Sequence, residues 1–146
     1  LALKEARNRW YLVSQDPKDN KFKSFSLDRI TNLDISHKKF EYPIDFNPEE
    51  KFEHAFGIIT DGIKPEKIKL WFSHAQADYI KSLPLHHSQK VISENDTECI
   101  MELYLCPTYD FVMELLSIGN EVKVLEPESL KQEIIERLES NIKQYK

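Results

Sequence analysis

An aromatic residue and two basic residues near the start of the chain could bind an anion together. Tyr11 lies in one strand-like run, and Lys23 and Arg29 lie in the next one. An aromatic ring can stack on a nucleotide base while nearby cations neutralise the phosphates. These side chains therefore predict a site for a nucleotide or a single-stranded nucleic acid. A structural role stays open, in which Arg29 pairs with Asp28 or Asp34 and Asp28 is a hydrogen-bond acceptor at a strand end.

Two adjacent histidines precede a serine in His86-His87-Ser88, a combination that could ligate a metal or supply a nucleophile. A zinc site needs three or four convergent ligands at a recognisable spacing, and the sequence has none. No serine lies in the glycine pattern of a nucleophile elbow, and three glycines cannot form a phosphate-binding loop. We expect structural hydrogen bonds from His86 and Ser88, and no catalytic residue, metal or cofactor.

Charge is unevenly distributed over the 146 residues, which carry a net charge of −5. Residues 1–40 hold nine basic and five acidic side chains, a balance of +4, so the remaining residues carry −9. An anionic partner is therefore expected at the first part, unless its lysines serve only solubility. No apolar run reaches the about 18 residues of a membrane span. Cys99 and Cys106 fit buried free thiols, so we expect a cytoplasmic protein without membrane contact.

Short strands dominate the first third of the chain. Polar turn residues separate the first two strands at 16–20. Short strands joined by short turns indicate a small antiparallel sheet or barrel, in which Trp10 and Leu12 are candidate core residues. This stretch is too short to close and cover a barrel, and Leu1 lies inside an apparent strand, so we expect further sequence upstream. The predicted strands cover residues 9–13, 22–30 and 32–35.

A short helix is predicted over residues 48–56. Asn47 is a good N-cap, a proline follows at the first helical position, and Glu50 stands at the third. Gly57 is a plausible residue to end the helix. We interpret this helix as a linker, followed by a hinge at 61–65.

Strands and helices alternate in the second half. The order β-α-β-β-α-β is a split βαβ unit, the ferredoxin-like arrangement. An extra C-terminal helix follows Pro127, with apolar residues at every fourth position. The predicted strands cover residues 67–72, 89–93, 97–106 and 121–125, and the predicted helices cover 74–82, 107–118 and the residues after 127.

Together these patterns predict an α+β chain. Residues 1–46 form a partial small β-barrel, residues 47–66 form the linker helix and hinge, and residues 67–146 form a ferredoxin-like domain with an extra C-terminal helix.

Five segments in order resemble the WYL-domain family, which is named for a Trp-Tyr-Leu triplet. The resemblance covers nearly the whole chain, although each motif alone is short. The segments are Leu3-Lys4-Glu5, Arg9-Trp10-Tyr11-Leu12-Val13, Phe25-Ser26-Leu27-Asp28-Arg29-Ile30, Leu85-His86-His87-Ser88-Gln89, and Gly119 with Val122-Lys123-Val124-Leu125-Glu126-Pro127.

The resemblance implies a bacterial transcription regulator. In such proteins a winged helix-turn-helix domain precedes a WYL domain with an Sm-like, SH3-type barrel, and a ferredoxin-like extension follows. Residues 1–46 would then be a partial WYL domain, and residues 67–146 the extension. The resemblance also implies a homodimer that senses a nucleotide or nucleic acid and binds promoter DNA through the missing N-terminal domain.

The resemblance implies a ligand site at Tyr11, Lys23, Ser26 and Arg29. Tyr11 and Arg29 match the family pattern, whereas Lys23 and Ser26 stand where the family often has arginines. Lysine keeps the charge of arginine without its planar fork, and serine offers only a hydroxyl. The site would therefore be weaker, or suited to a different ligand.

The leading hypothesis is a ligand-sensing and dimerisation region of a transcription regulator, without catalysis. A protein-interaction module without a small ligand is the first alternative, and a flat surface at Tyr11, Lys23 and Arg29 would favour it. A small hydrolase that uses His86 or His87 is the second alternative. It would need a concave site that joins a histidine to a carboxylate and a nucleophile.

Overall fold

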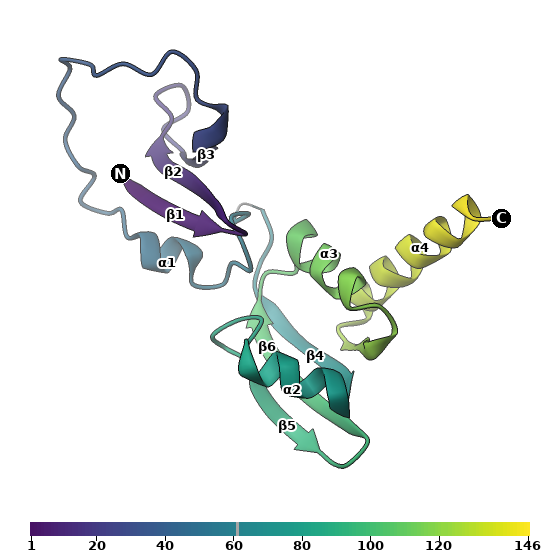
Figure 1. Cartoon of the computed structure of the whole chain (residues 1–146). Helices are drawn as coiled ribbons and strands as arrows, with labels where there is room; N and C mark the ends of the chain where they lie inside the picture. Colours follow the sequence, from purple (N-terminus) through teal and green to yellow (C-terminus); the bar gives the residue numbers. More distant parts are fainter. Residues whose placement is uncertain (61) are drawn as a thin grey trace. The chain divides into compact units, whose positions relative to one another are not determined.

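The structure is a computed structural model that describes residues 1–60 and 62–146 (Figure 1). The chain divides into two compact units, Leu1–Glu53 and His54–Lys146, which we call the N-terminal and C-terminal units. Asp61, the first residue of the predicted hinge, lies outside the described residues.

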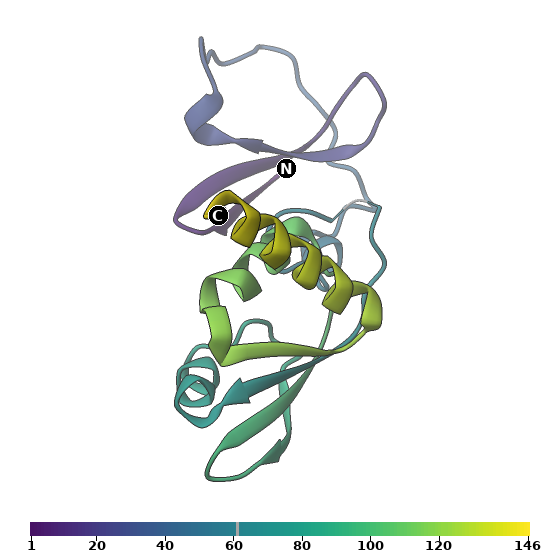
Figure 2. The same ribbon diagram turned by 90° about the vertical axis from the view of Figure 1, so that its right-hand side faces the viewer.

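The N-terminal unit is built on one antiparallel sheet in the order β1-β2-β3. A two-residue turn at Arg7 and Asn8 joins β1 to β2, and both residues have positive φ angles, 51° and 60°. Such turns match the twist of the flanking strands. The sheet is open and does not close into a barrel (Figure 2). The elements are β1 (Ala2–Ala6), β2 (Arg9–Gln15), β3 (Phe22–Ser26), the 3-10 helix η1 (Leu27–Arg29) and α1 (Pro48–Phe52).

Only one face of this sheet is buried. Val13 has no exposed surface, and the Phe22 ring lies 4.6 Å from the ring of Phe46, which is itself buried. Trp10 points to the opposite face and is 53% exposed, while Leu12 on that face is half-buried. The expectation that Trp10 and Leu12 form the core was wrong, because the register places Val13 on the covered face.

Three predicted elements differ in the structure. The strand from Phe22 ends at Ser26, because η1 turns the backbone there. No strand forms at 32–35, where Leu33 and Ile35 are 83% and 88% exposed and have no partner strand. The linker helix ends at Phe52, four residues earlier than predicted.

The start of the linker helix is as predicted. The side chain of Asn47 accepts hydrogen bonds from the backbone N–H groups of Glu49 and Glu50, at 3.0 and 3.5 Å. Gly57 has another role than the predicted stop. A Cβ atom at Gly57 would lie 2.1 Å from Oδ2 of Asp110, so glycine permits a close approach to that side chain.

The C-terminal unit has the predicted element order, on an antiparallel sheet with strand order β5-β6-β4-β7. The first strand, β4, therefore lies between the third and the fourth. Every register pairing in this sheet is antiparallel. The elements are β4 (Glu66–Ser73), α2 (His74–Ser82), β5 (Lys90–Glu94), β6 (Glu98–Leu105), α3 (Tyr109–Ile118), η2 (Gly119–Glu121), β7 (Val122–Glu126) and α4 (Glu128–Gln144).

Alternate residues of the two central strands form the core of this unit. Leu70 and Phe72 of β4 and Met101 of β6 have no exposed surface, and they cluster with Ile80 of α2 and Phe111 of α3. One face of the sheet is thus covered by α2 and α3. In α4, Leu130 belongs to the core, whereas the later turns lead away from the central strands (Figure 1). Within the described residues, no helix is long and apolar enough to cross a membrane.

Candidate functional site

Tyr11 and Ser26 lie directly opposite each other on the N-terminal sheet. The register pairs Tyr11 with Ser26 on β3 and with Lys4 on β1. Directly paired residues share a face of the sheet, so these three side chains form one row across it. Arg9 lies two positions before Tyr11 and shares that face. The Nζ atom of Lys4 is 5.2 Å from the ring centroid of Phe52, so this cation also packs on α1.

An internal carboxylate occupies the end of this row. The Ser26 hydroxyl donates a hydrogen bond to Asp28, and Nη1 of Arg9 lies 3.9 Å from Oδ2 of Asp28. The hydrogen bond from Ser26, together with the charges of Arg9 and Arg29, lowers the pKa of Asp28. Asp28 is therefore the strand-end acceptor that was expected. The ion pair with Asp28 comes from Arg9, while Arg29 is exposed and acts on Asp28 through its charge.

Lys23 belongs to the other face of the sheet. It pairs in register with Ser14, which lies three residues after Tyr11 and therefore on the opposite face of β2. Its Nζ atom lies 2.7 Å from Asp16 and 2.8 Å from Asp19, both in the turn between β2 and β3. Hydrogen bonds from Lys23 lower the pKa of both carboxyl groups, and they raise the pKa of Lys23. The structure thus keeps Lys23 away from Tyr11 and neutralises its charge locally.

The cations on the face of Tyr11 are therefore Lys4 and Arg9, and Arg29 follows Asp28 in η1 and acts on that carboxylate through its charge. We call these three basic residues, together with Tyr11 and Ser26, the Tyr11 cluster. It offers an aromatic ring, a hydroxyl and three positive charges against one carboxylate, that of Asp28. The cluster can neutralise an anion and offer a ring for stacking. Sequence reasoning missed Lys4 and Arg9, although the turn at Arg7 and Asn8 and the period of two along a strand are enough to place both near Tyr11.

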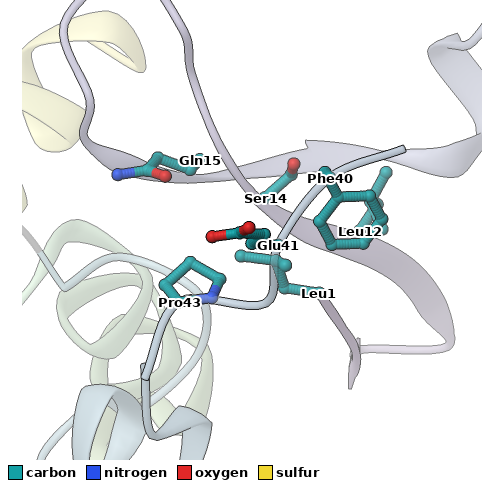
Figure 3. Close-up of a pocket in the computed structure, with 7 residues that line it drawn as sticks. All are labelled: Leu1, Leu12, Ser14, Gln15, Phe40, Glu41 and Pro43. Atoms are coloured by element: carbon teal, nitrogen blue, oxygen red, sulfur yellow. The ribbon is translucent and has the colours of Figure 1, made fainter. Parts of the chain in front are cut away.

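A cavity of about 360 Å³ lies elsewhere in the N-terminal unit (Figure 3). Residues of β2 and of the segment before α1 line it, and no member of the Tyr11 cluster does. The charged side chain in its wall is Glu41, so the cavity does not suit an anion. The lining residues are Leu1, Leu12, Ser14, Gln15, Phe40, Glu41 and Pro43.

The His86-His87-Ser88-Gln89 segment ties α2 to β6 in the C-terminal unit. The Ser88 hydroxyl accepts a hydrogen bond from the Tyr104 N–H at 2.8 Å and donates one to the Tyr104 carbonyl at 3.1 Å. Nδ1 of the buried His86 lies 2.8 Å from the same hydroxyl. Gln89 accepts a hydrogen bond from the Leu85 N–H and donates one to the Ile80 carbonyl at the end of α2. The hydroxyl is thus bonded to backbone, which favours a structural role. Among the described residues, no group of three potential ligands could hold a metal.

The family model of the WCX domain matches residues 64–140. The chain belongs to the WCX domain family. The matched residues include the His86-His87-Ser88-Gln89 segment and Gly119, two of the features on which the sequence resemblance rests, so the resemblance is confirmed for this part of the chain. The WCX domain comprises all the strands of the C-terminal unit and most of α4.

A solved structure of proteasome accessory factor B/C (PafBC) of Arthrobacter aurescens is similar to 94% of this chain, with 20% sequence identity and a TM-score of 0.42. The present chain spans 21% of that protein's length. No curated protein matches the chain.

Proposed function

We propose that this chain is the ligand-sensing and dimerisation region of a bacterial transcription regulator. In this proposal residues 1–46 are a partial WYL domain with Sm-like barrel strands, and residues 67–146 are a ferredoxin-like extension. The effector is a nucleotide or a single-stranded nucleic acid. The regulator acts as a homodimer and binds promoter DNA through a helix-turn-helix domain outside this chain.

Two findings support the domain assignment. The WCX domain is the WYL-associated C-terminal module, and the Trp10-Tyr11-Leu12 triplet lies N-terminal to it, as a WYL domain would. The strand order β5-β6-β4-β7, with helices α2 and α3 on one face, is what a split βαβ unit of the ferredoxin-like type requires.

The Tyr11 cluster is the observation that carries the effector proposal. Lys4 and Arg9 share the face of the Tyr11 ring, and Asp28 is the carboxylate that the charges of Arg9 and Arg29 act on. An anionic effector can replace Asp28 as the partner of Arg9 and Arg29, and its base can stack on Tyr11. Because these groups are exposed or half-buried, we expect moderate affinity with a strong dependence on salt.

The test is fluorescence anisotropy with labelled short single-stranded oligonucleotides and labelled cyclic nucleotides at low and physiological salt. We expect binding that Arg29→Ala and Tyr11→Ala each weaken by about tenfold, in line with the loss of a charge-assisted contact or a stacked ring. Asp28→Asn removes the competing carboxylate and should tighten binding. Lys23→Ala is the matched control, because Lys23 lies on the other face and is paired with Asp16 and Asp19.

Each outcome has a consequence. Absence of binding to all of these probes would refute the effector proposal. Equal losses in Lys23→Ala and Arg29→Ala would show that binding is a general effect of positive charge and does not depend on the Tyr11 cluster.

A protein-interaction module without a small ligand is the second candidate. An apolar row crosses the face of the N-terminal sheet that carries Trp10, where Leu3 pairs with Leu12 and Leu12 with Phe25. Leu3 and Phe25 are 60% and 41% exposed. Exposed apolar side chains in a contiguous row are typical of protein contacts. Intact binding of nucleotides would favour the effector proposal over this one.

A further inference from the structure

The last turns of α4 present a partly exposed apolar stripe on the C-terminal unit. Ile135, Leu138 and Ile142 are 37%, 45% and 53% exposed. Their spacing of three and then four residues places them along one line of the helix, as in the seam of a coiled coil. We call these three residues the α4 seam. The helix packs on the core of its unit through Leu130 and Ile134, so the seam runs beside the packed face.

An apolar groove continues from the seam onto the body of the C-terminal unit. The groove has a volume of about 200 Å³ and runs between α3, β7 and α4. Leu116, Val122 and Ile134 contribute to its wall, and so do Ile135 and Leu138 of the seam. Seam and groove therefore form one apolar surface, which fits an amphipathic helix laid along α4.

The charges of α4 indicate which helix that is. Residues 128–136 contain three glutamates and one lysine, whereas residues 137–146 contain one arginine, two lysines and one glutamate. The first part thus carries −2 and the second +2. A second α4 in antiparallel orientation would place the acidic part of each helix along the basic part of the other. Antiparallel packing also opposes the two helix dipoles favourably, whereas parallel packing would bring like charges together.

We propose that the α4 seam is a homodimer contact, at which α4 packs antiparallel on α4 of a second copy of this chain. The two-fold axis passes near Leu138, the middle residue of the seam. Ile142 of each copy then lies over the groove beside Ile134 of the other. This inference rests on the homodimer in the proposed function and specifies its surface.

The size of the contact sets the expected strength. The strip from residue 131 to 145 is about 20 Å long and about 10 Å wide, from the rise and the diameter of a helix. The area of this strip is well below the about 800 Å² per partner that stable dimers usually bury. We therefore expect a weak dimer, with a dissociation constant in the micromolar range.

Sedimentation equilibrium of the full chain from about 10 to about 500 µM, a range chosen for weak association, tests the surface. Wild type should dimerise, and Leu138→Glu should raise the dissociation constant roughly a hundredfold, because the change affects both partners at the centre of the contact. The matched control is Leu83→Glu, since Leu83 follows α2 in the same unit and is 78% exposed. Circular dichroism checks that both variants stay folded.

A disulfide experiment tests the orientation. In the antiparallel pair two copies of Leu138→Cys lie face to face and should crosslink under mild oxidation. Two copies of Tyr145→Cys lie about 21 Å apart along the helices, which is beyond disulfide reach. The native Cys99 and Cys106 are buried, so they leave the assay unaffected.

The outcomes separate this surface from the proposed function. A dimer that Leu138→Glu leaves intact would overturn the α4 seam and keep the homodimer. Wild type that stays monomeric throughout would overturn both, while the effector assay would still stand by itself. Crosslinking of Tyr145→Cys, with or without crosslinking of Leu138→Cys, would overturn the antiparallel arrangement.

Discussion

Replacing Ser88 with alanine should destabilise the C-terminal unit. Ser88 lies just before β5, and its hydroxyl binds both the N–H and the carbonyl of Tyr104 on β6, at 2.8 and 3.1 Å. The side chain thereby adds one rung to the ladder between β5 and β6. Ser88→Ala removes both hydrogen bonds and the contact of the hydroxyl with Nδ1 of His86, and it leaves two backbone groups of Tyr104 without this partner.

The size of the effect follows from these two hydrogen bonds. Each contributes about 1 kcal/mol to the free energy of unfolding. Tyr104 is 43% exposed, so water replaces part of the loss, and we expect a decrease of about 1–2 kcal/mol. With a slope near 2 kcal/mol per molar urea, the unfolding midpoint should fall by about 0.5–1 M.

Urea denaturation followed by tryptophan fluorescence measures this change. Trp71 lies in β4 and Trp10 in the N-terminal sheet, so a Trp10→Phe background reports on the C-terminal unit alone. Ser117→Ala is the control, since the Ser117 hydroxyl donates to the Glu114 carbonyl of its own helix and its loss should cost less than about 0.5 kcal/mol. A Ser88→Ala midpoint equal to that of Ser117→Ala would refute the structural role.

Two further predictions concern packing and pH. Gly57→Ala should lower the free energy of unfolding by about 1 kcal/mol, because its Cβ would lie 2.1 Å from Oδ2 of Asp110 and the carboxylate must turn away from the Thr108 hydroxyl that donates to it. Urea denaturation should show partial recovery in Gly57→Ala/Asp110→Ala, and no recovery would contradict the clash. Lys23 lowers the pKa values of Asp16 and Asp19 from 3.8. The stabilisation that these ion pairs give the N-terminal unit should therefore be complete above pH 3.8 and be lost as acid protonates the two carboxylates. Urea denaturation at pH values from about 2 to about 7, on both sides of 3.8, measures this loss. In Asp16→Asn the free energy of unfolding should fall less steeply with decreasing pH, and a fall as steep as in wild type would contradict this account.

The elements of the C-terminal unit were predictable from the sequence because pattern and packing agree there. Ile68, Leu70 and Phe72 alternate on β4, and the structure buries all three on one face. The predicted helix over 74–82 forms as α2, and the Ser73 hydroxyl caps it by accepting a hydrogen bond from the Gln76 N–H. The exposure of the α4 seam could not be predicted, because helical periodicity does not tell which apolar residues of a helix pack on the rest of the unit.

The N-terminal unit was less predictable because its outcome depends on pairing between strands. Leu33 and Ile35 show the alternation of a strand, but no strand pairs with them. The composition of the candidate site also depends on pairing, because an odd or even separation along a strand decides which side chains share a face. Lys23 lies three residues from Ser26, an odd separation that puts the two on opposite faces, and Ser26 is the one opposite Tyr11. Composition identified a basic segment, and only the register identified which cations share a face.

The uneven burial of the two units bears on how an effector would act. In the N-terminal unit the buried apolar residues are Val13 and Phe46, whereas the C-terminal unit has a core of fourteen buried residues. A small core leaves a unit with marginal stability. A ligand stabilises the part of the protein that it binds by an amount set by its concentration relative to its dissociation constant. In the proposed function, an effector at the Tyr11 cluster would therefore bind and stabilise the unit with the smaller core. A ligand biases one conformation over another only to the extent that it binds the two with different affinities.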